Sequence, residues 1–468
     1  MTDSPQSLFW HRRDLRTIDN VGLEQATENG RVLPVFVLDP NLLSMAGTAR
    51  TGFLLASLSS LQQTYREMNT DLLVRRGDPK EIVPALADKF DAKTVTWNQD
   101  HSKVARERDG AVRDALPTDI ITESPVDMTL HEPGSIRTNA GEYYSVFSYY
   151  FKKWSDRPKD TPAAQPSQQD FASYDTTDIM DLIDPPRESI PLPAGRRAAE
   201  DRLASFLDGP IYEYAELRDK PAAEGSSRLS QDLSMGLLGI REVFEGTARA
   251  KSAVEAETPR ESVTEFQRQL AWRDFYIQVL DAHPNTVSEN FKSYENQIEW
   301  RDEPGHFTAW TDGKTGYPIV DAGMRQLQAE SYMHNRVRML VASFLTKDLQ
   351  LDWRKGYQWF RTHLLDHETA NDVAGWQWAA STGTDAQPYF RVFNPMTQGE
   401  RYDPEAEYIT SYISELAGVD PETIHSWHEL DRDQRQSVAP DYPGPIVDHQ
   451  TRRKSAIEMF KRARGDDS

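Results

Sequence analysis

The first 130 residues alternate between short apolar runs that are typical of strands and longer amphipathic stretches that are typical of helices. The apolar runs lie at residues 8–10, 32–38, 72–74 and 94–97. The amphipathic stretches between them include residues 53–68 and 80–90. Strands that alternate with helices pair in parallel and place the helices on both faces of the sheet. We therefore expect an α/β domain with a parallel, Rossmann-like sheet over residues 1–130.

The remainder of the chain has a different pattern. Residues 131–195 are predicted to be an interdomain linker, because the stretch 155–193 is rich in Pro, Asp, Ser and Gln and shows little periodicity. From residue 196 onward helical periodicity dominates, with Ser or Thr at helix starts and Gly or Pro at helix ends. We therefore expect an all-α C-terminal domain over residues 196–468.

Composition restricts the chemistry. The chain has no cysteine, which excludes disulfides and thiolate catalysis and agrees with a cytoplasmic location. A net charge of −21, with acidic residues spread along the chain, favours a halophilic source. No run approaches the roughly 18 apolar residues of a membrane span. His363 and His367 have the spacing of a zinc pair on a predicted helix, but a third ligand is missing, so we expect no metal.

Polar residues follow the predicted strands, at the edge where open α/β sheets bind ligands. These ends are 10–13, 38–40 and 97–100. Neither a Gly-x-Gly-x-x-Gly sequence nor a phosphate-loop Lys motif is present, so the N-terminal domain does not carry a common nucleotide motif.

Four segments of the C-terminal half combine residue types that bind ring systems or phosphates. Residues 224–230 are small and hydroxyl-rich, which suits a phosphate or an ordinary capped helix. Trp272 and Tyr276 lie four residues apart beside Arg273, as a base-stacking face or as part of a core helix. Residues 333–339 place Asn335 where it can pair with a ring edge or face solvent. Residues 366–383 combine acids, amides and indoles, which suggests a polar ring system held against tryptophan.

Together these segments resemble the DNA photolyase/cryptochrome family over nearly the whole chain, most closely its haloarchaeal cyclobutane pyrimidine dimer members. Trp10-His11-Arg12-Arg13-Asp14-Leu15-Arg16 is similar to the family's first strand and turn. Residues 316–325, 375–385 and 393–395 match further signatures in the right order. The resemblance implies light-driven repair, in which reduced FAD gives one electron to a flipped-out pyrimidine dimer.

The resemblance also assigns roles to residues of this sequence. The cofactor-binding positions are Tyr214, Ser226, Ser227, Arg228, Leu229, Ser230, Phe266, Arg338, Asp366, His367, Glu368 and Asp372. Electrons would travel along Trp300, Trp353 and Trp376, with Trp376 nearest the flavin, while Asp372 and Gln269 would act at the reaction centre. The positions that would face UV-damaged DNA are Arg218, Gln269, Trp272, Arg273, Tyr276, Asn335, Arg336, Met339, Trp378, Arg391 and Gln398.

Four positions bear on which lesion is repaired and on whether the chain is an enzyme or a light sensor. Asn335 and Met339 stand where six-four enzymes carry a His pair, which favours cyclobutane dimers. Gln269 stands where most bacterial cyclobutane enzymes have Glu, and it is the feature that supports a six-four enzyme. Asp372 replaces the usual Asn and is seen in plant cryptochromes, which favours a light sensor. Ionised, this carboxylate would oppose the charge of the anionic reduced flavin.

A second chromophore is expected in the α/β domain. Val104 and Ala105 replace the Asn-Glu pair of folate-binding relatives, so deazaflavin is favoured over folate. The positions near this antenna are Val37, Leu38, Arg50 and Asp100. We expect a monomer. In a salt-rich cytoplasm we also expect DNA binding to depend more on stacking of the flipped dimer than on phosphate contacts, because salt weakens the latter steeply.

Overall fold

The computed structural model describes residues 6–174, 176 and 190–466. Part of the predicted linker, residues 175 and 177–189, lies outside the described residues. The chain forms two compact units. The first unit comprises Met1–Ala215, Ser227–Asn285 and Leu365–Ala370, and the second comprises Glu216–Ser226, Thr286–Leu364 and Asn371–Ser468.

The first unit contains a parallel sheet of five strands in the order β3-β2-β1-β4-β5. The strands are β1 (Ser7–His11), β2 (Val32–Leu38), β3 (Leu73–Arg76), β4 (Thr94–Thr96) and β5 (Ile121–Glu123). In the central register, Phe9 of β1 lies opposite Pro34 of β2 and Thr96 of β4. The predicted parallel α/β sheet is confirmed. The short, partly exposed strand β5 was not predicted.

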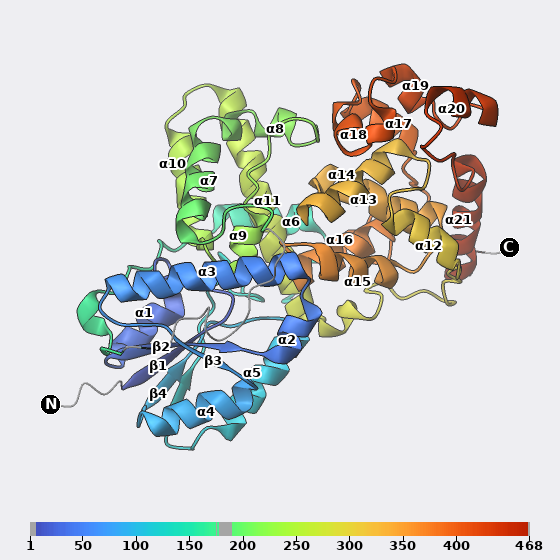
Figure 1. Ribbon diagram of the computed structural model, residues 1–468. Coiled ribbons are helices and arrows are strands. Elements are labelled where there is room, and N and C mark those ends of the chain that lie inside the picture. Colours follow the sequence, from blue (N-terminus) through green and yellow to red (C-terminus); the bar gives the residue numbers. More distant parts are fainter. Residues whose placement is uncertain (1–5, 175, 177–189, 467–468) are drawn as a thin grey trace. The chain divides into compact units, whose positions relative to one another are not determined.

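Helices cover both faces of this sheet, with α3 along one side and α4 and α5 along the other (Figure 1). They are α1 (Val21–Glu28), α2 (Pro40–Met45), α3 (Thr48–Glu67), α4 (Pro79–Lys89) and α5 (Lys103–Ala115). Side chains of Asn20, Asp78 and Ser102 accept hydrogen bonds from the first turns of α1, α4 and α5. The core between the layers includes Trp10, Val35 and Trp97.

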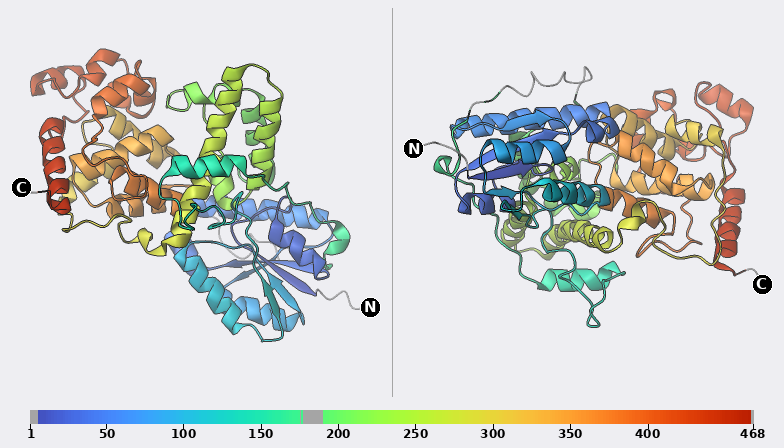
Figure 2. Two further views of the ribbon diagram at one scale, coloured as in Figure 1. Left: turned by 180° about the vertical axis from the view of Figure 1, so that it is seen from behind. Right: turned by 90° about the horizontal axis from the view of Figure 1, so that it is seen from below.

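The other helices of the first unit form a bundle. They are α6 (Phe147–Asp156), α7 (Arg196–Asp208), α9 (Ser230–Met235), α10 (Ile240–Ser252) and α11 (Glu257–Ala282). Helix α11 packs against α10 and against α6, and both contacts can be followed in the left view of Figure 2. Helix α6, drawn in teal, falls within the predicted linker. Helix α8 (Tyr214–Leu217) contains residues of both units.

The second unit is helical, and the predicted all-α region is confirmed. Its helices are α12 (Pro304–Thr311), α13 (Pro318–Glu330), α14 (Asn335–Ser343), α15 (Trp353–His363), α16 (Thr369–Ala379), α17 (Pro395–Tyr402), α18 (Glu407–Tyr412), α19 (Pro421–His425), α20 (Arg432–Val438) and α21 (His449–Arg464), of which α16 begins with two residues of the first unit. Trp310, Trp353, Trp376 and Trp427 belong to one buried core. Helix α15 ends at His363, so the prediction that His363 and His367 share a helix is wrong.

Candidate cofactor and DNA-binding sites

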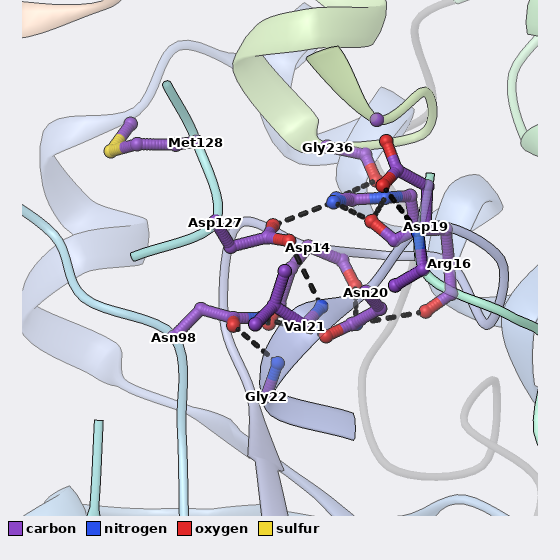
Figure 3. A network of polar contacts seen from close by, with 12 residues as sticks. Asp14, Arg16, Asp19, Asn20, Val21, Gly22, Asn98, Asp127, Met128 and Gly236 are labelled. Carbon is purple, nitrogen blue, oxygen red and sulfur yellow. Dashed lines mark hydrogen bonds and ion pairs between the residues drawn. The ribbon is translucent and has the colours of Figure 1, made fainter. Parts of the chain in front are cut away.

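The polar residues after β1 and β4 meet where the strand order reverses, the place at which such sheets bind ligands. Asn98 Nδ2 donates to Asp14 Oδ2 at 2.5 Å and to Asn20 Oδ1 at 2.8 Å, and Asn98 Oδ1 accepts from the Gly22 amide at 2.8 Å (Figure 3). Burial raises the pKa of Asp14, but hydrogen bonds from His11, the Arg12 amide and Asn98 outweigh it and lower this pKa to about 2. Asp14 is therefore a fixed anion at neutral pH.

Arg13, just beyond β1, lies between two acidic side chains. Its Nη1 is 3.5 Å from Asp100 Oδ2 and 3.6 Å from Glu368 Oε1, and its Nε donates to the Ser234 carbonyl at 3.0 Å. Burial opposes ionisation of Asp100, but the charges of Arg13 and Arg12 lower its pKa far below the ordinary range. The Arg13 guanidinium thus lies between Asp100, which is predicted to be near the antenna, and Glu368, which is predicted to bind FAD.

The other predicted antenna residues lie near the same edge of the first unit. Val37 and Leu38 are buried at the end of β2. Arg50, in α3, donates through Nη2 to the Met45 carbonyl at 3.3 Å, which closes the turn between α2 and α3. These residues border an edge that already gathers Arg12, Arg13 and Asp100.

A buried charge network ties the loop after β1 to α10. Arg16 Nη2 is 2.6 Å from Asp127 Oδ2, and Arg241 lies 2.7 Å from Asp127 Oδ1 through Nη2 and 2.5 Å from Asp19 Oδ1 through Nε. All four residues are buried, with at most 5% of their surface exposed. Figure 3 shows Arg16, Asp19 and Asp127 together, with the Gly236 carbonyl accepting from Arg16. Two cations balance two anions, as buried charges require.

The predicted phosphate segment precedes α9. Arg228 has a left-handed backbone (φ 51°), and the segment presents the hydroxyls of Ser227 and Ser230. Ser226 belongs to the second unit. Asp232, the nearby acid, is buried and paired with Arg202 at 2.6 and 2.9 Å, so its charge is compensated. Hydroxyls and a guanidinium are the donors that a diphosphate accepts, and this donor set fits FAD.

Helix α9 also connects this segment to the predicted flavin segment 366–368. The Ser234 hydroxyl donates to the His367 carbonyl at 2.8 Å, and Asp366 and Glu368 are buried. Leu229 is buried at the start of the helix. The first unit thus brings the two parts of the predicted FAD set to opposite ends of one short helix.

Tyr214 and Phe266 form an aromatic contact in the same unit. Their ring centroids are 5.3 Å apart at an interplanar angle of 89°, and Phe206 packs on Phe266 at 4.7 Å. Tyr214 and Phe266 are both buried. The second unit contributes the remaining predicted FAD residues, Arg338 and Asp372. Arg338 Nε donates to the Met333 carbonyl at 2.7 Å, and Asp372 lies one turn before Trp376 on α16.

The three tryptophans predicted to carry electrons lie in the second unit. The Trp376 ring contacts Gly356 of α15, where an added Cβ would stand 2.1 Å from Trp376 Cη2. Trp353 begins α15 and donates from Nε1 to Asn290 Oδ1 at 3.0 Å. The backbone amide of Arg301, next to Trp300, donates to the Gln350 carbonyl at 2.8 Å, and residues 301 and 351 form a parallel β-bridge. The Trp376 ring contact with Gly356 and the backbone pairing of residues 301 and 351 therefore bring the segments of Trp376, Trp353 and Trp300 side by side.

The predicted DNA-facing residues are divided between the units. In the first unit, Trp272 and Tyr276 lie on one face of α11, with ring centroids 5.1 Å apart. Arg273 donates to the Met128 carbonyl, and Gln269 Nε2 donates to Glu265 Oε1 at 3.2 Å. Arg273 is therefore engaged inside the protein.

In the second unit, Asn335 begins α14 and is exposed, and Met339 lies one turn later. Trp378 packs on Phe393 with ring centroids 6.3 Å apart. Arg391 is exposed, Gln398 lies on α17, and Arg218 is 4.0 Å from Asp219. Arg336 pairs with the same Asp219 at 2.7 Å.

Three residues in these contacts were not predicted from the sequence. Phe147 stacks on Trp272, Asp219 holds Arg336, and Gln377 joins α16 to the 286–291 segment through the Phe291 amide and the Thr286 carbonyl. Asp219 directly follows Arg218, so a neighbouring countercharge was the signal available for it. For Phe147 and Gln377 the sequence offered none, because their partners are distant along the chain.

Over the described ranges, no group of three or more His, Asp or Glu side chains could hold a metal ion. Within the same part of the chain, no helix is both long and apolar enough to cross a membrane.

Comparison with known proteins gives matches along nearly the whole chain. The family model described as "DNA photolyase" matches residues 7–168, and the one described as "FAD binding domain of DNA photolyase" matches residues 266–462. The deoxyribodipyrimidine photo-lyase of Halobacterium salinarum is 53% identical over 480 residues, covering 98% of this chain and 100% of the relative.

Two solved structures are similar throughout. A class III photolyase from Agrobacterium tumefaciens has a TM-score of 0.90 at 33% identity, with 99% of each chain covered. An archaeal photolyase from Sulfolobus tokodaii, solved with two FAD molecules, has a TM-score of 0.84 at 31% identity and covers 97% of this chain and 99% of its own.

Proposed function

The chain belongs to the DNA photolyase family, and on this premise we propose that it uses FAD and light to split cyclobutane pyrimidine dimers in DNA. The observation that carries the proposal is the full-length likeness to relatives named deoxyribodipyrimidine photo-lyase. The enzyme is thus a carbon–carbon lyase.

FAD, when bound and reduced, supplies an electron to the dimer after it absorbs light. The protein holds and shields this chemistry. We assign the diphosphate to Arg228 and the hydroxyls of residues 226–230, and one wall of the cofactor to Tyr214 and Phe266. Arg338, Asp366, His367, Glu368 and Asp372 would surround the flavin ring. The donor set of the segment before α9 supports this assignment, and Asp232, within α9, is already paired with Arg202.

Trp376, Trp353 and Trp300 would supply electrons from the surface to the cofactor. Support comes from the contact of Trp376 with Gly356, one turn into the helix that Trp353 begins, and from the pairing of residues 301 and 351. Trp376 and Trp353 are at most 2% exposed, whereas Trp300 is only partly buried. A path that runs from partial exposure to full burial suits electron uptake from a reductant in solution.

Trp272 and Trp378 would stack on the flipped-out dimer, and Asn335, Met339 and Gln269 would line its edge. Flipping costs least for a damaged, poorly stacked pair, which favours lesions over normal bases. Asp372 is the residue that favours the second candidate function, a light sensor of cryptochrome type.

The test is illumination of the reduced protein with oligonucleotides that contain one cyclobutane dimer or one six-four photoproduct, followed by chromatography of the bases. We expect restored thymines from the cyclobutane substrate, none from the six-four substrate, and none in the dark. Absence of repair of both lesions by FAD-loaded protein would reject the enzyme in favour of the sensor.

We also propose a second chromophore near Val37, Leu38, Arg50 and Asp100 in the first unit, with deazaflavin favoured over folate. The Sulfolobus relative, with its two FAD molecules, supports a second chromophore but suggests another identity. Mass spectrometry of chromophores released from protein purified from a deazaflavin-producing host distinguishes these three. Release of FAD alone at two molecules per chain would contradict deazaflavin.

A further inference from the structure

We propose that Phe147 is a positioning residue for Trp272: its ring covers one face of the indole and leaves the opposite face for a base of the flipped-out dimer. The inference rests on the proposed function, because it deepens the role assigned to Trp272. Phe147 lies in the first turn of α6, in a region that the sequence indicated to be a linker.

The contact between the two rings is close and nearly parallel. Their centroids are 3.6 Å apart and their planes differ by 11°. Aromatic pairs in proteins usually have centroids about 4.5–7 Å apart, so these rings overlap almost fully. Phe147 is 3% exposed, whereas Trp272 is only partly buried. One face of the indole is therefore occupied by protein, and the side chain retains an exposed part.

Two further rings of α11 restrict the indole. Phe275 meets it edge-on, with centroids 5.7 Å apart at 80°, and Tyr276 lies at 5.1 Å and 37°. Phe147 on one face, Phe275 edge-on and the tilted Tyr276 ring together restrict the Trp272 side chain before any ligand arrives.

The supporting helix is itself anchored. From Phe147 the rings of Phe151 and Trp154 follow along α6, at 5.7 Å and 24° and then at 6.0 Å and 21°. Trp154 Nε1 donates to Asp274 Oδ2 at 2.9 Å, and the Leu130 amide donates to the same oxygen at 3.1 Å. Both ends of the α6 column thus contact α11, at Trp272 and at Asp274, which fixes the column against the helix it supports.

A side chain held in its binding orientation loses less conformational freedom when a base stacks on it. Replacing Phe147 by Leu keeps an apolar side chain of similar volume but removes the flat support. Dimer binding should then weaken about 5- to 10-fold. Because the contact is apolar, the loss should be the same at low and high salt.

The experiment measures dark affinities of the FAD-loaded protein for one oligonucleotide with and without a thymine dimer, at two KCl concentrations. Phe147→Leu is expected to weaken binding of the dimer only, at both salts, with a thermal midpoint lowered no more than in Tyr150→Leu and with unchanged repair per absorbed photon at saturating substrate. Tyr150→Leu is the matched control. Tyr150 lies on α6, as Phe147 does, and packs on Phe275 of α11 with ring centroids 5.3 Å apart, but it does not stack on Trp272.

A double-mutant cycle completes the test. In a Trp272→Leu background the Phe147→Leu change should have no further effect on dimer affinity. If Trp272→Leu weakens dimer binding and Phe147→Leu does not, the inference is overturned and the proposed function stands. Equal losses for Phe147→Leu and Tyr150→Leu would also overturn it, since both would then report helix packing. If Trp272→Leu leaves dimer binding unchanged, the stacking role proposed for Trp272 itself fails.

Discussion

Arg336 and Asp219 form a two-pronged ion pair in the second unit. Arg336 Nη2 is 2.7 Å from Asp219 Oδ2, and Arg336 Nε donates to Asp219 Oδ1 at 3.2 Å. The guanidinium also lies 4.5 Å from the centre of the Tyr402 ring. A residue predicted to face DNA therefore already has an internal counter-ion in a geometry that suits a bidentate pair.

Replacing Asp219 by Asn should release this guanidinium for phosphate. We expect tighter DNA binding at low salt and a log–log salt slope steeper by about 0.9, the contribution of one more neutralised phosphate. Titration of oligonucleotide binding with KCl measures the slope. Asp433→Asn, at an exposed site on α20, makes the same change in net charge and serves as the control. Equal slopes for the two variants would contradict the prediction.

Replacing Trp376 by Phe should slow photoreduction of bound FAD at least about tenfold, while repair by chemically reduced enzyme stays unchanged. The reason is that Phe is much harder to oxidise than an indole. Trp427→Phe is the control, because Trp427 is fully buried in the same core and donates from Nε1 to the Pro443 carbonyl at 2.9 Å. Absorbance changes on illumination measure the rate, and an equal loss in both variants would count against the path.

Replacing Arg13 by Gln should destabilise the first unit by about 2 kcal/mol at pH 7, since Asp100 and Glu368 lose their shared cation. The pKa of Asp100 is lowered in the folded protein, so its contribution is present above the unfolded value of 3.8 and is lost as pH falls below it. Denaturant unfolding of both proteins from pH 3 to 7 checks this. A difference that does not shrink toward pH 3 would argue against the assignment.

The contribution of Asp274 to folding stability has the opposite pH dependence to that of Asp100. Burial raises the pKa of Asp274 from 3.8 to about 6, even though the Trp154 indole and Arg273 favour its ionised form. Because the folded protein holds the proton more tightly, this group's contribution to stability falls as pH rises from about 4 to 6, by roughly 3 kcal/mol, and is constant above. Asp274→Asn should therefore gain stability relative to wild type across this interval. A difference independent of pH would refute the cause.

Replacing Asp372 by Asn should favour the fully reduced cofactor, because it would remove a carboxylate that we propose to lie beside an anionic flavin. We expect the two-electron potential of bound FAD to rise by roughly 30 mV, equivalent to about 1.4 kcal/mol. Spectroelectrochemical titration measures the shift, and dark reoxidation in air should slow with it. An unchanged potential would place the Asp372 carboxylate away from the flavin ring.

Local sequence patterns correctly predicted the features that depend on neighbouring residues, namely helix faces and most of the strands. The spacing of Trp272 and Tyr276 placed them on one helix face, and four of the five strands followed from their apolar runs. The pairing of His363 with His367 failed because α15 ends at His363, and the boundary of a helix depends on tertiary context. The stacking of Phe147 on Trp272 brings together residues more than a hundred positions apart. Such long-range contacts cannot be predicted from the pattern of a single sequence.

The charge network around Asp127 has a consequence for how the protein is made. Arg16, Asp19 and Asp127 emerge early from the ribosome, but Arg241, which bonds both acids, follows more than a hundred residues later. Until then the nascent α/β sheet holds two acids and one base in what will become its interior. Final closure of this network must wait for α10, so cutting the chain at the linker would leave Asp19 and Asp127 buried without Arg241.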